Sequence, residues 1–302
     1  MLKVVEAFSG IGAQKQALEK LNIEHEIINT IEWDINAIYA YDIMHHNDNS
    51  PSKLSKHEII ERLANVTLSP DGKKPFSDNG LYRIKEEKLQ KLYAAIRRNN
   101  NLCDITQVSG DMIPDDTDLL TYSFPCQDLS IGSVWYNKDN DGIRKGAKTR
   151  SGLLWEIERI LRERIMINVP LPKFLLMENV NAITSPKHNP NFVQWQEELE
   201  SMGYTNKVYK GLNALDFGVP QSRSRTFMLS IRNKDIEPEE ISNLNYNIQS
   251  NLGDYLRFNH KEEIIEATPN YTPSRIKIYN QNRLLAKNGV VKADFTNTIS
   301  TK

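Results

Sequence analysis

The sequence has few cysteines, no long apolar run and almost no net charge, and each shortage excludes a class of protein. Two cysteines in 302 residues, Cys103 and Cys126, cannot build a disulfide framework and fit a reducing compartment. No apolar run is long enough to cross a bilayer, and residues 1–6 lack the layout of a signal peptide. The net charge is −1, so binding to nucleic acid would need a local basic surface. We therefore expect a soluble cytoplasmic protein with no membrane association.

What the sequence does contain is an alternation of two patterns. Short apolar, β-rich runs alternate with segments of helical period, which is typical of an α/β fold with a mostly parallel central sheet covered by helices. We expect strands at 4–8, 27–31, 119–124, 174–177 and 226–231, and helices at 35–43, 153–161 and 192–202. A chain with 39% hydrophobic residues can bury a sizeable core in such a fold.

Composition divides the chain into parts. A polar stretch from about 47 to 101, with a charged segment at 85–98 that is expected to be helical, interrupts the alternation and is interpreted as an insertion between core strands. From about residue 233 the composition shifts towards Asn and Lys. We therefore predict a main domain at 1–232 and a smaller region at 233–302.

Three short segments follow expected strands or precede one. The first strand runs into Phe8-Ser9-Gly10-Ile11-Gly12, a glycine turn that leaves room for a ligand at the start of a helix. Glu32-Trp33 ends the second strand, where a carboxylate can accept bonds from ribose hydroxyls and an indole can stack on a base. Asp104-Ile105 could contact an adenine amino group. Taken singly, each segment is equally consistent with a plain turn, a solvated acid or a cap.

Cys126, within Ser123-Phe124-Pro125-Cys126-Gln127, is the most distinctive single residue. It lies just past a central strand, where open α/β sheets place their chemistry, and a thiolate there would be a nucleophile. A lone cysteine is more often a small buried hydrophobe, and Cys103 fits that interpretation.

Polar side chains follow two further strands. Glu178-Asn179 ends the run 174–177, where a carboxyl emerging from an apolar strand is suited to hydrogen-bond with a ring nitrogen. Arg223 and Arg225 would share one face of an extended segment and could fix an anion or a base carbonyl. A capping glutamate and two solvated arginines are the alternatives.

Read together and in order, these segments resemble the DNA cytosine-5 methyltransferase family. The resemblance rests on the glycine turn, Glu32-Trp33, Asp104-Ile105, Pro125-Cys126-Gln127, Thr149-Arg150-Ser151-Gly152-Leu153-Leu154, Glu178-Asn179-Val180 and residues 213–221 continuing to Arg223 and Arg225. It implies a Rossmann-like S-adenosylmethionine-dependent methyltransferase fold with the start of a smaller target-recognition region, of the kind found in restriction–modification systems.

The resemblance also implies roles for particular residues. Cys126 would be the nucleophile that bonds to C6 of a flipped-out cytosine in double-stranded DNA, assisted by Glu178, Arg223 and Arg225. The residues implied in binding S-adenosyl-L-methionine are Phe8, Gly10, Ile11, Gly12, Glu32, Trp33, Asp104, Ile105, Pro125 and Leu154. Gln127 and Ser130 would contact DNA, and no metal is expected.

The sequence departs from the family pattern near its end. It has Asn270-Tyr271-Thr272-Pro273-Ser274 without a following acid, and no closing Gly-Asn motif. Some family members are split into two polypeptides, and we expect this chain to be the larger, catalytic one, with a second, smaller polypeptide as its partner. Two alternatives remain: a non-catalytic module that binds DNA or a partner, and a methyltransferase acting on RNA cytosine.

Overall fold

Four strands form the parallel centre of the sheet. The computed structural model describes residues 1–129, 142–147, 149–232, 273 and 296–297. The parallel strands are β1 (Leu2–Ala7), β2 (His25–Ile31), β3 (Leu119–Tyr122) and β4 (Phe174–Val180). They lie in the order β2-β1-β3-β4, continued by β7 (Ser224–Ile231) and β5 (Thr205–Asn213). The predicted α/β fold with a mostly parallel sheet is confirmed.

The two outer strands run against their neighbours. The backbone N–H of Arg232, just past the end of β7, donates to the carbonyl of Lys173, just before β4 begins. The hydroxyl of Ser230, near the end of β7, donates to the side-chain carbonyl of Asn206, near the start of β5. The sequence did not predict β5, because none of its residues is buried and the strand has no apolar run to reveal it.

One irregularity lies between β1 and β2. Val4 is level with Ile27, but Val5 is level with Asn29, so Ile28 is an extra residue in β2 and forms a β-bulge. Beyond the bulge the pairing is regular as far as Ala7 and Ile31.

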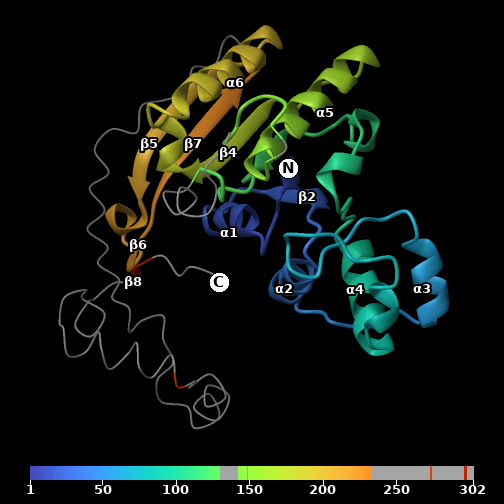
Figure 1. Ribbon diagram of the computed structural model, residues 1–302. Coiled ribbons are helices and arrows are strands. Elements are labelled where there is room, and N and C mark those ends of the chain that lie inside the picture. Colours follow the sequence, from blue (N-terminus) through green and yellow to red (C-terminus); the bar gives the residue numbers. More distant parts are fainter. Residues whose placement is uncertain (130–141, 148, 233–272, 274–295, 298–302) are drawn as a thin grey trace. The chain divides into compact units, whose positions relative to one another are not determined.

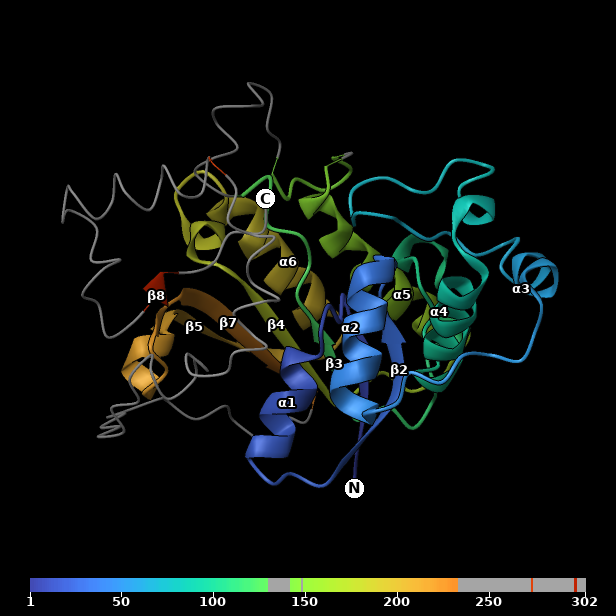
Figure 2. The ribbon, with the colours of Figure 1, turned by 90° about the horizontal axis from the view of Figure 1, so that it is seen from below.

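Helices cover both faces of the parallel strands. In Figures 1 and 2, α1 (Ala13–Lys20) and α2 (Ile35–His46) lie on one face, and α5 (Leu154–Met166) and α6 (Asn189–Ser201) on the other. The core under α5 and α6 includes the edge-to-face contacts of Trp195 with Tyr122 and Trp155. The predicted helices at 35–43, 153–161 and 192–202 are confirmed.

The insertion forms a small helical layer beside α2. It contains α3 (Lys56–Arg62), with a capping box from Ser55 and Glu58, and the predicted helix α4 (Glu86–Arg98). A separate apolar cluster joins these helices to α2 through Ile35 and Ile38. Ser69 pairs with the turn after β2, since its N–H donates to the Trp33 carbonyl. The insertion therefore packs against the carboxyl end of β2.

Two compact units make up the chain, and each is described by itself. The first comprises residues Met1–Val208 and Thr226–Glu239, and the second comprises Tyr209–Arg225 and Glu240–Lys302. The second unit thus takes the segment 209–225 from within the predicted main domain. It contains β6 (Gln221–Ser222), paired in parallel with β8 (Thr296–Asn297). Most of the predicted recognition region, 233–302, lies outside the described residues. No helix in the described part is both long enough and apolar enough to span a membrane.

Candidate functional site

The pairing of the four parallel strands places the residues at their carboxyl ends side by side. Ala7 in β1 is level with Ile31 in β2 and with Tyr122 in β3, which in turn is level with Met177 in β4. The next residue on each strand reaches the carboxyl edge of the sheet: Glu32, Phe8, Ser123 and Glu178, in spatial order. Neighbouring strands are about 4.8 Å apart, so this row spans roughly 14 Å. The structure therefore brings four of the predicted segments to one edge.

The glycine turn follows β1 in a left-handed conformation. Phe8, Gly10 and Gly12 have φ of 55°, 53° and 80°. Positive φ values favour glycine, which explains the glycines at positions 10 and 12. A Cβ added at Gly10 would meet nothing nearer than the Phe8 carbonyl oxygen at 4.0 Å, so the space beside Gly10 is open. The turn can therefore be approached closely by a ligand.

The Glu32 carboxylate is fixed by backbone groups. It accepts hydrogen bonds from the N–H of Gly10 at 3.0 Å and from the N–H of Asp34 at 2.8 Å. Burial raises the pKa of this carboxyl, while the two N–H donors act in the opposite direction. Glu32 thus links the end of β2 to the glycine turn, and the half-buried Trp33 stands next to it.

Asn101 holds the backbone of Glu32 and was not found by sequence reasoning. Its side-chain oxygen accepts from the Glu32 N–H and its amide nitrogen donates to the Glu32 carbonyl, both at 3.0 Å. The same oxygen accepts from the Cys103 N–H at 2.9 Å. Asn101 also forms an isolated parallel bridge with Thr30, so it extends the sheet beyond β2 by a single residue. No periodic pattern marks such a residue.

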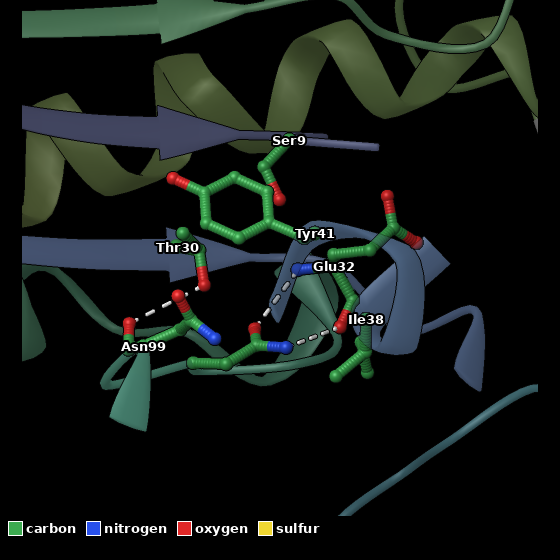
Figure 3. Close-up of a pocket in the computed structure, with 7 residues that line it drawn as sticks. Ser9, Thr30, Glu32, Ile38, Tyr41 and Asn99 are labelled. Atoms are coloured by element: carbon green, nitrogen blue, oxygen red, sulfur yellow. Dashed lines mark hydrogen bonds between the residues drawn. The ribbon is translucent and has the colours of Figure 1, made fainter. Parts of the chain in front are cut away.

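A small pocket lies behind this part of the edge. Its lining consists of Ser9, Thr30, Glu32, Ile38, Tyr41, Asn99 and Asn101. Figure 3 shows the Tyr41 ring near Ser9 and Thr30, with the Glu32 carboxylate turned away from Asn99. The pocket therefore joins the glycine turn, the end of β2 and α2.

The turn that carries Cys126 is held by three side chains from other elements. Gln14 of α1 donates to the Ser123 hydroxyl at 2.8 Å. Asn179, which is 1% exposed, donates to the Phe124 carbonyl at 3.0 Å. The Ser151 hydroxyl donates to the Pro125 carbonyl at 2.7 Å. Cys126 itself is partly exposed.

Cys103 provides a contrast with Cys126. It is 2% exposed, and burial raises the pKa of its thiol to about 12. A thiol held in this state is a poor nucleophile, in accord with the expectation that Cys103 has no chemical role.

Three residues predicted to bind the cofactor lie away from the carboxyl edge of the sheet. Ile105 and Leu154 are 4% and 0% exposed and belong to the core under α5 and α6. Asp104 is half-buried and caps the short helix Ile105–Gln107 by accepting from the Thr106 N–H at 3.0 Å. The structure thus gives these three residues packing or capping contacts, and their cofactor roles stay predictions.

The remaining predicted residues fall at the margins of the described chain. Gln127 is exposed, and Ser130 lies outside the described residues. Arg223 and Arg225 belong to the second unit. There the Arg223 N–H donates to the Asn213 side chain at 3.0 Å, and the Arg225 guanidinium donates to the Ser224 carbonyl at 2.8 Å. Their relation to Cys126 stays a prediction.

Comparison with known proteins gives consistent matches. Residues 81–301 match the family described as C-5 cytosine-specific DNA methylase. The orphan methyltransferase M.SssI of Spiroplasma monobiae is 43% identical over 78% of this chain and 61% of its own length. The type II methyltransferase M2.ScrFI of Lactococcus lactis subsp. cremoris is 38% identical over 77% of this chain and 62% of its own length.

A solved structure shares the fold. The Dnmt2 methyltransferase of S. pombe aligns with a TM-score of 0.50 at 21% identity, over 86% of this chain and 62% of that one. At this identity the likeness concerns the fold alone. The chain spans about three fifths of the length of the curated relatives named above.

Proposed function

Because the chain belongs to the C-5 cytosine-specific DNA methylase family, we propose that it is the catalytic part of an S-adenosyl-L-methionine-dependent DNA (cytosine-5) methyltransferase. The observation that carries the proposal is the common register of β1 to β4. It brings the glycine turn, Glu32, the segment leading to Cys126, and Glu178 to one edge of the sheet. The names of two relatives, both methyltransferases, support the reaction class.

The residues at the edge fit S-adenosyl-L-methionine. The open space at Gly10 allows close approach to the backbone, and the fixed Glu32 carboxylate can accept from ribose hydroxyls. Phe8, Ile11, Gly12 and the residues predicted with them would complete the site. When bound, the cofactor supplies the methyl group that is added to C5.

The chain's own groups would act on the cytosine ring. Cytosine C5 is a poor nucleophile, and addition of the Cys126 thiolate to C6 forms an S–C6 bond and makes C5 enamine-like. Glu178 would hydrogen-bond N3 and the exocyclic amine, offsetting the charge that develops in the ring. Arg225 would contact the base carbonyl, with Arg223 supporting it. After methylation, loss of the C5 proton and breakage of the S–C6 bond free Cys126.

The target base must leave the duplex for this chemistry. Neither C6 nor N3 is accessible in stacked DNA, so the cytosine would be flipped out, at a cost of roughly a few kcal/mol. Gln127 and Ser130, which follow Cys126 directly, are the proposed DNA contacts.

We also propose a second, smaller polypeptide as partner. A helix that follows the first strand of a parallel sheet normally buries one face. In the described chain no residue of α1 is buried, and Ile11, Leu21 and Ile23 around it are 51%, 68% and 41% exposed. Exposed apolar side chains at both ends of α1, Ile11 in the glycine turn and Leu21 and Ile23 past the other end, suit a covering segment, and we assign that segment to the partner.

The test uses duplex DNA in which 5-fluorocytosine replaces cytosine throughout. Fluorine cannot leave as a cation, so the S–C6 bond persists and yields a denaturation-resistant adduct. We expect the adduct with the wild-type chain, S-adenosyl-L-methionine and the proposed smaller polypeptide, but not with Cys126→Ser. Cys103→Ser is the matched control and should form the adduct.

Each outcome has one meaning. An undiminished adduct in Cys126→Ser would refute the assigned nucleophile. An adduct with the chain alone would refute the need for a partner. Failure of every preparation to form an adduct on DNA, with methyl transfer to RNA or with none, would favour one of the alternatives instead.

A further inference from the structure

Two side chains of α2 reach beneath the glycine turn. Tyr41 and His45 are four residues apart, so they lie on the same face of the helix, and their ring centroids are 4.6 Å apart. The Tyr41 hydroxyl donates to the Glu6 carboxylate at 2.6 Å, and His45 Nε2 lies 2.9 Å from the Ile11 carbonyl oxygen. Ile11 is part of the turn itself.

The Glu6 carboxylate connects Tyr41 to α1, because it accepts hydrogen bonds from both. It is fully buried in β1, and its second oxygen accepts from the backbone N–H of Lys15 at 2.8 Å. Gly12 is the N-cap of α1 and has no side chain with which to satisfy the first N–H groups of the helix. The Glu6 carboxyl oxygen replaces that cap by accepting from the Lys15 N–H group. Tyr41 therefore orients the group that holds the start of α1.

The His45 contact explains why the residue after Ile11 is a glycine. A Cβ at Gly12 would lie 2.2 Å from His45 Nε2 and 2.7 Å from Tyr41 Cε2. The His45 side chain is 1% exposed, so it cannot move aside into solvent. A carbonyl oxygen only accepts hydrogen bonds, so Nε2 carries the proton and donates to Ile11. The two rings and the glycine therefore form one packed unit.

We propose that Tyr41 and His45 are positioning residues for cofactor binding. They hold the peptide between Ile11 and Gly12, and the start of α1, in the conformation that binds S-adenosyl-L-methionine. The identity of this ligand rests on the proposed function, whereas the positioning of the turn does not. Without these contacts the turn occupies its binding conformation for a smaller fraction of the time, and the apparent affinity falls by that fraction.

The experiment compares two pairs of variants on one helix. Tyr41→Phe removes a hydroxyl, and His45→Ala removes the donor to Ile11. Tyr39→Phe and His46→Gln are the matched controls, because the Tyr39 hydroxyl donates to the Lys88 carbonyl and the His46 ring contacts Asn99 in the insertion. Titration calorimetry gives the Kd for S-adenosyl-L-methionine, and amide hydrogen exchange reports on residues 11–15 of the ligand-free chain.

We expect the Kd to rise about tenfold in Tyr41→Phe and His45→Ala, the effect of losing one buried hydrogen bond to a fixed group. His45→Gln, whose amide can reach the same carbonyl, should recover part of the loss. Exchange at residues 11–15 should increase in both variants, and the controls should stay within about twofold of the wild type.

Three results would overturn the inference or separate it from the proposed function. Unchanged Kd and unchanged exchange in Tyr41→Phe and His45→Ala would overturn it. Faster exchange throughout β1 and α5, rather than in residues 11–15, would show a general structural role and would also overturn it. If the wild-type chain binds no S-adenosyl-L-methionine even with the proposed smaller polypeptide present, the proposed function fails, while the exchange measurement still tests the positioning of the turn.

Discussion

Asn101 offers a direct test of how the site is supported. Asn101→Ala removes three hydrogen bonds, two to the Glu32 backbone and one from the Cys103 N–H, and leaves their partners unmatched. Asn101 is half-buried, so water can compensate in part, and we take about 1 kcal/mol for each bond. The expected loss is about 3 kcal/mol of unfolding free energy, or a decrease in Tm of about 6–12 °C for a unit of this size.

Thermal melting followed by circular dichroism measures this loss, with exposed Asn49→Ala in the insertion as the control. Asn49→Ala should melt within about 2 °C of the wild type. The Kd for S-adenosyl-L-methionine should rise in Asn101→Ala, because Glu32 no longer has a fixed backbone. A Tm equal to that of Asn49→Ala would refute the view that the Asn101 side chain stabilises the end of β2. A lower Tm with an unchanged Kd would show that Asn101 supports the fold and has no effect on cofactor binding.

Two further variants test the contacts around β1 and α1. Gln14→Leu removes the hydrogen-bond donor to Ser123, so it should slow adduct formation on 5-fluorocytosine DNA about three- to tenfold with little change in Tm. Gln16→Leu on the same helix is the control and should leave the rate of adduct formation unchanged. Equal rates in the two variants would contradict a role for the Gln14 contact. Burial raises the pKa of Glu6 from 4.5, so the folded chain binds that proton more tightly than the unfolded chain. The contribution of Glu6 to stability is therefore fully present below about pH 4.5 and declines as the pH rises through the raised pKa. Glu6→Gln abolishes this titration, so the Tm of the variant relative to the wild type should increase between about pH 4.5 and pH 7, and a constant difference would contradict the assignment.

The buried parts of the fold could be predicted from the sequence, because burial leaves a pattern. Strands β1, β3 and β4 are apolar runs, and α5 carries a helical stripe that includes Ile157, Ile160 and Leu161. β5 carries no such run, since all of its residues reach solvent in part. α3 is short, although Ser55 and Glu58 form a capping box that could have revealed its start.

Some residues of the candidate site can be predicted from the sequence and others cannot. Cys126 lies four residues past the end of β3 and Glu178 lies near the end of β4, and such residue types at the carboxyl ends of strands predict chemistry from the sequence alone. Asn101, Tyr41 and His45 act by contacting backbone or buried groups of distant segments. Their roles depend on which segments become neighbours in space, and no spacing along the chain encodes this.

The bulge at Ile28 divides β2 into a part before it, where the number of residues can change, and a part after it, where the number is fixed. It absorbs one residue before Asn29, so Glu32 stands level with Phe8 although the strands reach that level by different numbers of residues. Loss or gain of a residue on the amino side of the bulge can be accommodated there. The same change between Asn29 and Ile31 would turn Glu32 to the opposite face of the sheet. The distance in sequence between the glycine turn and Glu32 can thus change at the bulge without turning Glu32, while the three residues that precede Glu32 are constrained in number.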